Sequence, residues 1–158
     1  MLLVPLLITA SVAGLLPLQI VRVEAGSMSP TLKQGQLVLV DRTDHDVARR
    51  DVVVAESPLD GSLLVKRAVA LGGDTVGLED GVLVVNGEPV CEPGIDQALI
   101  DGMYFGPVTV REGSVFLLGD HRDGSIDSRE FGAVPLPSVV GEVDARLFPP
   151  GGIETGSC

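Results

Sequence analysis

Basic residues, aromatic residues, histidine and cysteine are all scarce in this sequence of 158 residues. There are 11 Lys and Arg against 22 Asp and Glu, which gives a net charge of −11. Such a chain is a poor partner for nucleic acid, because phosphate binding needs cationic side chains that displace counterions. Trp is absent and aromatics make up only 3% of the residues, so Val and Leu have to fill the core. The spacing of Cys91 and Cys158 matches no metal site, and it leaves open whether they pair or stay free.

Charge is also missing from the whole N-terminal stretch, because the first charged residue is Arg22. At a helical rise of ~1.5 Å per residue, residues 1–21 are about 31 Å long, the thickness of the hydrocarbon core of a bilayer. A cleaved signal peptide normally begins with basic residues, and a buried helix normally keeps a polar face. Neither feature is present, so we expect residues 1–21 to form a transmembrane anchor.

The remaining chain has the pattern of a mainly β domain over residues 22–149, followed by a flexible C-terminal tail over 150–158. Short Val- and Leu-rich runs alternate with turn residues, in keeping with 20 Gly and 11 Pro. Asn86-Gly87 and Asp80-Gly81 are typical of type I′ hairpin turns. Residues 92–107 contain scattered Pro, Gly and Asp and are expected to be a loop or an extension. The strands are expected at residues 18–24, 37–40, 51–55, 63–71, 82–85, 114–118 and 139–147.

Two segments carry residues suited to nucleophilic catalysis. Residues 26–32 read Gly-Ser-Met-Ser-Pro-Thr-Leu, so Ser27 is either an exposed nucleophile on a tight turn or an ordinary turn residue. In the second segment, a strand period of two places Lys66 on the same face as Ala68 and Ala70. Burial on such a face lowers the pKa of a lysine and can make it a neutral base, unless the amine reaches water at the strand edge.

The third segment, residues 119–132, reads Gly-Asp-His-Arg-Asp-Gly-Ser-Ile-Asp-Ser-Arg-Glu-Phe-Gly. It follows an apolar strand and alternates Asp, Ser and Arg, a composition that allows a loop to fix itself through ion pairs and hydroxyl-to-backbone hydrogen bonds. This would leave one hydroxyl, of Ser125 or Ser128, to orient a neighbouring group.

Together the three segments resemble the bacterial type I signal peptidase family, membrane-anchored Ser-Lys proteases that remove signal peptides. Residues 26–32 are similar to the nucleophile box of that family, residues 66–74 to its lysine box and residues 119–129 to its C-terminal box. The resemblance covers about residues 21–147, in the family's order. It implies a compact antiparallel β fold with one N-terminal transmembrane helix.

The resemblance also implies a role for each matched residue. Ser27 would be the nucleophile, its backbone N–H would meet the oxyanion, and Lys66 would be the general base. Ser125 would orient the Lys66 amine. The residues that would support the same loop are Asp127 and Arg129, as a pair, together with Asp120 and Arg122.

The implied protein is a serine endopeptidase that uses no metal and no cofactor. Its partners would be signal-peptide-bearing preproteins, cut after small residues at positions −1 and −3, and the lipid bilayer. The catalytic domain would lie on the extracytoplasmic side of the cell membrane, held by a single span. Three alternatives stay open: a maturation protease dedicated to one precursor, an inactive module that binds extended peptides, and a Ser27–His121–Asp120 triad.

Overall fold

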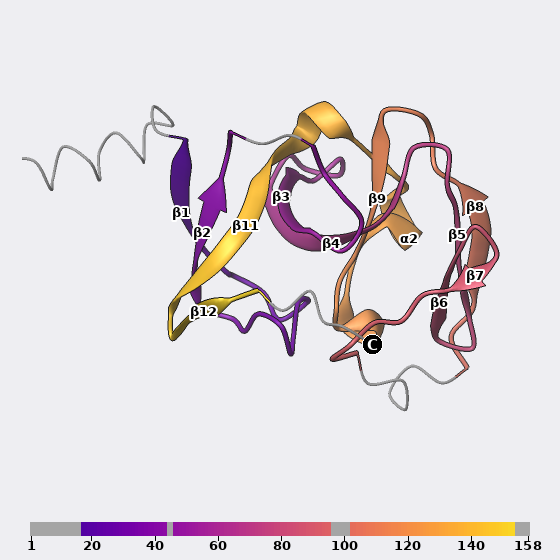
Figure 1. The fold of residues 1–158 in the computed structure, drawn as a ribbon, viewed down its shortest axis with the longest axis horizontal. Helices are drawn as coiled ribbons and strands as arrows, with labels where there is room; N and C mark the ends of the chain where they lie inside the picture. Colours follow the sequence, from indigo (N-terminus) through magenta and orange to yellow (C-terminus); the bar gives the residue numbers. More distant parts are fainter. Residues whose placement is uncertain (1–16, 44–45, 96–101, 154–158) are drawn as a thin grey trace, which may run out of the picture.

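The computed structural model describes residues 17–43, 46–95 and 102–153, whose antiparallel strands form two sheets (Figure 1). The larger sheet contains β1 (Leu18–Arg22), β2 (Leu37–Asp41), β3 (Val52–Glu56), β4 (Leu63–Leu71), β9 (Ser114–Leu118), β10 (Val134–Pro135), β11 (Val139–Phe148) and β12 (Pro150–Gly152). The smaller sheet contains β5 (Thr75–Glu79), β6 (Val82–Val85), β7 (Glu88–Pro89) and β8 (Phe105–Thr109). Three short helical segments complete the described elements: η2 (Arg122–Gly124), α2 (Ser128–Phe131) and η3 (Leu136–Ser138).

The strand order of the larger sheet brings distant parts of the chain together. It runs β1-β2-β11-β3-β4-β9-β10, with β12 paired to β11, and the smaller sheet runs β7-β6-β5-β8. In Figure 1, β1, β2 and β11 lie at one end of the molecule and the smaller sheet lies at the other. β4, the strand that was expected at residues 63–71 and contains Lys66, therefore lies inside the sheet between β3 and β9.

The structure confirms the mainly β class and most of the expected strands. Three of these, at residues 63–71, 82–85 and 114–118, have the expected bounds. Both hairpin dipeptides adopt the left-handed conformation that a type I′ turn requires, with φ of 53° and 77° at Asp80 and Gly81 and 55° and 80° at Asn86 and Gly87. The expectation of a loop over residues 92–107 was wrong at its end, because β8 begins at Phe105.

Two expected boundaries need correction. The last residues of the expected span, 18–21, lie in β1, where alternate side chains are exposed and the backbone pairs with β2. Residues 150–152 of the expected tail form β12 on β11, and residues 154–158 lie outside the described residues. No helix in residues 17–43, 46–95 or 102–153 is both long and apolar enough to cross a membrane, and residues 1–16 of the expected anchor lie outside these ranges.

Cys91 takes part in a disulfide, so none of the cysteines in the described part of the chain is free. The open question about Cys91 is thus settled in favour of pairing. Cys158 lies outside the described residues.

Three apolar clusters make up the core and determine where the candidate site lies. One joins the two sheets, with Phe116 and Leu118 packed against residues of β5 and β6. A second lies beneath residues 26–32, and a third includes Ala68 and Leu117. The β4–β9 register shifts between Ala68 and Ala70, so Ala70 packs in the first cluster and Ala68 in the third. The expectation of one shared face for these two alanines was therefore wrong.

Candidate active site

Two apolar side chains seat the segment that carries Ser27. Met28 and Leu32 are 1% and 0% exposed and pack with strands β2, β3 and β11. The backbone between them turns tightly, with Leu32 N–H donating to Met28 O at 2.8 Å. Ser27 itself stays half-buried. Burial of its neighbours thus fixes the turn and leaves the Ser27 hydroxyl at the surface of the core.

Lys66 reaches the Ser27 hydroxyl from the middle of β4. Its Nζ lies 2.7 Å from Ser27 Oγ and 3.1 Å from Ser125 Oγ, and the residue is only 4% exposed. Burial lowers the pKa of Lys66 below its usual value of 10.5, and the nearby charge of Arg129 lowers it further. The negative charges of Asp127 and Asp120 act in the opposite direction but do not reverse the shift.

The loop after β9 is fixed by Asp127 and Arg129. Asp127 caps α2 and accepts hydrogen bonds from Nε and Nη2 of Arg129, both at 2.8 Å, and from Gly119 N–H at 3.0 Å. Burial alone would raise the pKa of Asp127, but these hydrogen bonds outweigh it and hold the pKa below its usual value. Arg129 Nη2 also donates to Arg122 O at 2.7 Å, so one ion pair organises the whole turn that presents Ser125.

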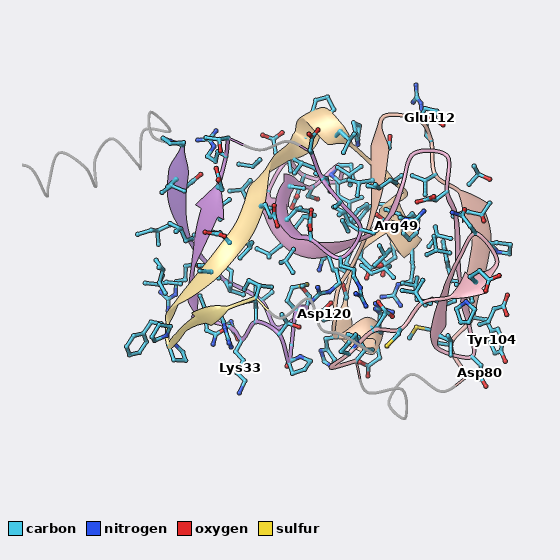
Figure 2. The ribbon with its side chains drawn as sticks, viewed as in Figure 1. Lys33, Arg49, Asp80, Tyr104, Glu112 and Asp120 are labelled. Carbon is cyan, nitrogen blue, oxygen red and sulfur yellow. The ribbon has the colours of Figure 1, made fainter. Side chains whose placement is uncertain are left out.

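Asp120 is held by a residue of the neighbouring strand. Arg67 Nε and Nη2 donate to its two oxygens at 2.8 and 2.7 Å, and Thr31 Oγ1 donates at 2.5 Å. Figure 2 shows Asp120 in the interior of the molecule, and its side chain is 0% exposed. This cluster ties together the segment of Ser27, strand β4 and the loop after β9.

The residues match a known family. The family model described as signal peptidase, peptidase S26, matches residues 1–148. The chain belongs to the signal peptidase family. Its relatives include a signal peptidase I of Bacillus caldolyticus, 37% identical in an alignment of 142 positions that covers 80% of this chain and 78% of that protein. A signal peptidase I of Mycobacterium tuberculosis is 39% identical in an alignment of 132 positions that covers 67% of this chain and 45% of that protein.

A solved structure supports the same assignment. The crystal structure of a signal peptidase I from Enterococcus faecalis matches with a TM-score of 0.56 and 32% sequence identity, over 62% of this chain and 97% of that one. The antiparallel β fold is therefore that of a signal peptidase I. The expected family and enzyme class are both confirmed: the chain is a serine endopeptidase of the signal peptidase I type.

Within this signal peptidase, the structure brings together most of the residues singled out by sequence. Ser27, Lys66 and Ser125 meet around one amine, and Ser128 takes the structural role of accepting the Leu117 N–H at 2.9 Å. Arg122 does not pair with Asp120. The Ser27–His121–Asp120 alternative is contradicted, because the His121 ring lies 3.0 Å from Asp123 and Asp120 binds Arg67.

Sequence reasoning missed two participants in this signal peptidase. The partner of Arg122 is Glu92, whose side chain is 6% exposed and which lies outside all three motifs. Gly119 was placed in a motif without a role, yet a Cβ there would lie 2.2 Å from Ser125 Oγ. The Glu92–Arg122 ion pair joins residues 30 apart, so it leaves no periodic pattern in the sequence. Gly119 could have been found from the sequence, because it directly follows an apolar strand.

Proposed function

We propose that the chain removes N-terminal signal peptides from exported preproteins, with Ser27 as nucleophile and Lys66 as general base. The observation that carries this proposal is the 2.7 Å separation between Lys66 Nζ and Ser27 Oγ in a buried setting that lowers the lysine pKa. A serine hydroxyl becomes nucleophilic only when a neighbouring group takes its proton, and a neutral amine at hydrogen-bond distance can do so.

In the proposed reaction, Ser27 Oγ attacks the scissile carbonyl carbon while its proton passes to Lys66 Nζ. The backbone N–H of Ser27 donates a hydrogen bond to the oxyanion that forms. Collapse of this intermediate breaks the C–N bond, and the Lys66 ammonium returns the proton to the leaving amine. Water then hydrolyses the acyl-enzyme with Lys66 again acting as base. Ser125, 3.1 Å from Nζ, keeps the amine directed at Ser27.

The substrate is proposed to bind as an extended strand beside β4. β3 pairs with residues 63–67 of β4, but β9 pairs only from Arg67 onward. Within the described part of the chain, the second edge of residues 63–66 therefore has no strand partner. An extended peptide can satisfy such an edge through main-chain hydrogen bonds, next to Lys66. Cleavage after small residues at −1 and −3 is part of this proposal.

We also propose that the uncharged residues before β1 attach the chain to the cell membrane as a single span, with the catalytic domain on the extracytoplasmic side. The neighbouring end of the larger sheet exposes large apolar side chains, as a surface that faces a bilayer would. These are Leu18, Ile20, Leu37 and Phe148, on β1, β2 and β11. A protease-protection assay on membrane vesicles would contradict the topology if the domain were cut only from the cytoplasmic side.

The dyad is tested with Ser27→Ala and Lys66→Ala in the full chain, assayed on a purified preprotein. A general base contributes about 10²–10⁴-fold to the rate, so Lys66→Ala should lose at least that much cleavage. Lys33, which is exposed and projects away from the site (Figure 2), supplies the matched control Lys33→Ala. Wild-type cleavage by Lys66→Ala would contradict the assignment.

Substrate scope is tested separately with a panel of preproteins whose −1 residue is changed from Ala to Leu. General signal peptide processing requires cleavage of several unrelated preproteins and loss of cleavage on the Leu variants. Cleavage of a single member of the panel would instead identify a maturation protease dedicated to one precursor. Equal cleavage of Ala and Leu variants would contradict the small-residue rule.

A further inference from the structure

We propose that Glu92 is a positioning residue of the active site, which holds Arg122 and, through Arg122, the loop around Ser27 and Ser125. This inference rests on the catalytic roles proposed above. Glu92 follows β7, the last strand of the hairpin in the smaller sheet, and belongs to none of the catalytic motifs. Its carboxylate nevertheless lies beneath the catalytic loop.

The pairing of Glu92 with Arg122 is bidentate and buried. Arg122 Nη1 donates to Glu92 Oε2 at 2.8 Å, and Nη2 donates to Oε1. The two side chains are 6% and 0% exposed. A guanidinium bound through both Nη groups to one carboxylate is fixed in its plane. The third donor, Arg122 Nε, is thereby aimed at Gly119 O, which it binds at 2.9 Å.

Gly119 is the point at which this loop touches the catalytic residues. Its N–H donates to Asp127 at 3.0 Å and its carbonyl accepts from Arg122, so both peptide groups that flank its Cα are held. A Cβ on Gly119 would lie 2.6 Å from Ser27 O and 2.2 Å from Ser125 Oγ. The backbone of Gly119 is therefore closely packed on this side, and a shift toward Ser27 or Ser125 displaces them.

The charge of Glu92 is what keeps Arg122 in place. A buried guanidinium without a carboxylate partner is strongly unfavourable and tends to move toward water. If Arg122 moved, the Gly119 carbonyl would lose its donor, and the next peptide along, whose His121 N–H donates to Ser27 O at 3.0 Å, would lose its support. The segment that carries Glu92 is itself held by a second arginine, because Arg50 Nη2 donates to Cys91 O at 3.0 Å.

The test is Glu92→Gln in the full chain, which keeps the size of the side chain and removes its charge. Misplacement of a catalytic group by ~1 Å can cost 10²-fold in rate, so we expect kcat to fall about 10- to 100-fold while KM stays within twofold of wild type. Both constants are measured at a temperature well below the melting temperature of the variant. The matched control is Glu88→Gln, an exposed carboxylate on β7 four residues earlier. It should leave both kcat and the melting temperature unchanged.

Amide hydrogen exchange separates positioning from mere stabilisation. In Glu92→Gln, exchange of the His121 N–H should accelerate at least tenfold more than exchange of the Val38 N–H in the second apolar cluster. Equal acceleration at both amides, with wild-type kcat, would overturn the proposal. Because exchange is measured without substrate, it decides the role of Glu92 even if the wild type fails to cleave preproteins, an outcome that would count against the proposed function instead.

Discussion

Replacing Gly119 by Ala is the sharpest perturbation that the site offers, because it adds one methyl group where three segments meet. An ideal Cβ would lie 2.2 Å from Ser125 Oγ and 2.6 Å from both Ser125 Cβ and Ser27 O. Restoring separations of 3.0 Å requires movements of about 0.8 Å at Ser125 Oγ and about 0.4 Å at Ser27 O. Both atoms belong to residues that contact Lys66, so the proposed Ser27–Lys66 dyad is displaced.

The expected loss in kcat follows from these displacements. A misplacement of ~1 Å can reduce a rate by about 10²-fold, and we expect Gly119→Ala to approach that value with a smaller change in KM. Overpacking of a dense interior costs ~1–3 kcal/mol, which corresponds to a fall in melting temperature of about 2–12 °C for a domain of this size. The variant should therefore remain folded at 25 °C.

Cleavage of a fluorogenic signal-peptide substrate, with kcat and KM measured separately, checks this expectation. Gly152→Ala in β12 is the matched control, since a Cβ there has no atom within 4 Å and the φ of Gly152 needs no glycine. It should behave as wild type. A Gly119→Ala variant with kcat within twofold of wild type and an unchanged melting curve would refute the steric argument.

Three further expectations concern pH. Because burial lowers the pKa of Lys66, the cleavage rate should rise with pH and reach its plateau below pH 10.5, as a pH–rate profile would show. The same buried amine costs stability while it is protonated, so Lys66→Met should be more stable than wild type in urea at pH 6, and this gain should vanish above pH 10.5. For Asp127, hydrogen bonds from Arg129 and Gly119 outweigh burial and lower the pKa below 3.8, so its stabilising effect is present above pH 3.8 and lost on further acidification. Asp127→Asn should thus lose about 3 kcal/mol at pH 7, and the difference from wild type should shrink below pH 3.8 in acid-unfolding curves.

Local signals made much of the fold predictable from sequence. β4, β6 and β9 are apolar runs bounded by turn residues, and Asn86-Gly87 fixes the hairpin after β6 by its backbone preference. β5 and β8 escaped prediction because they contain Gly77 and Gly106, and glycine is depleted in strands. The pairing itself explains these glycines, since a Cβ on Gly77 would lie 3.0 Å from Phe105 O.

Some residues of the candidate site were also predictable from the sequence, and others were not. Ser27, Lys66 and Ser125 were predictable because three segments resemble, in order, the sequence boxes of one family. Composition alone left Ser27 open as a turn residue and did not separate Ser125 from Ser128. Glu92 was not, because a single acidic residue in a stretch rich in Pro and Gly has the pattern of a solvated loop. Only the folded chain shows that it is buried opposite Arg122.

The two carboxylates whose charges act on Lys66 raise a problem that the fold has to solve. Asp127 and Asp120 both favour the ammonium form of Lys66, which cannot act as a base. Each is bound by its own arginine, Asp127 by Arg129 and Asp120 by Arg67, so its charge is largely compensated before it acts on the amine. Arg129 additionally lowers the pKa of Lys66. Burial of the amine can therefore dominate, and the site gains the rigidity of two buried ion pairs while Lys66 keeps a lowered pKa.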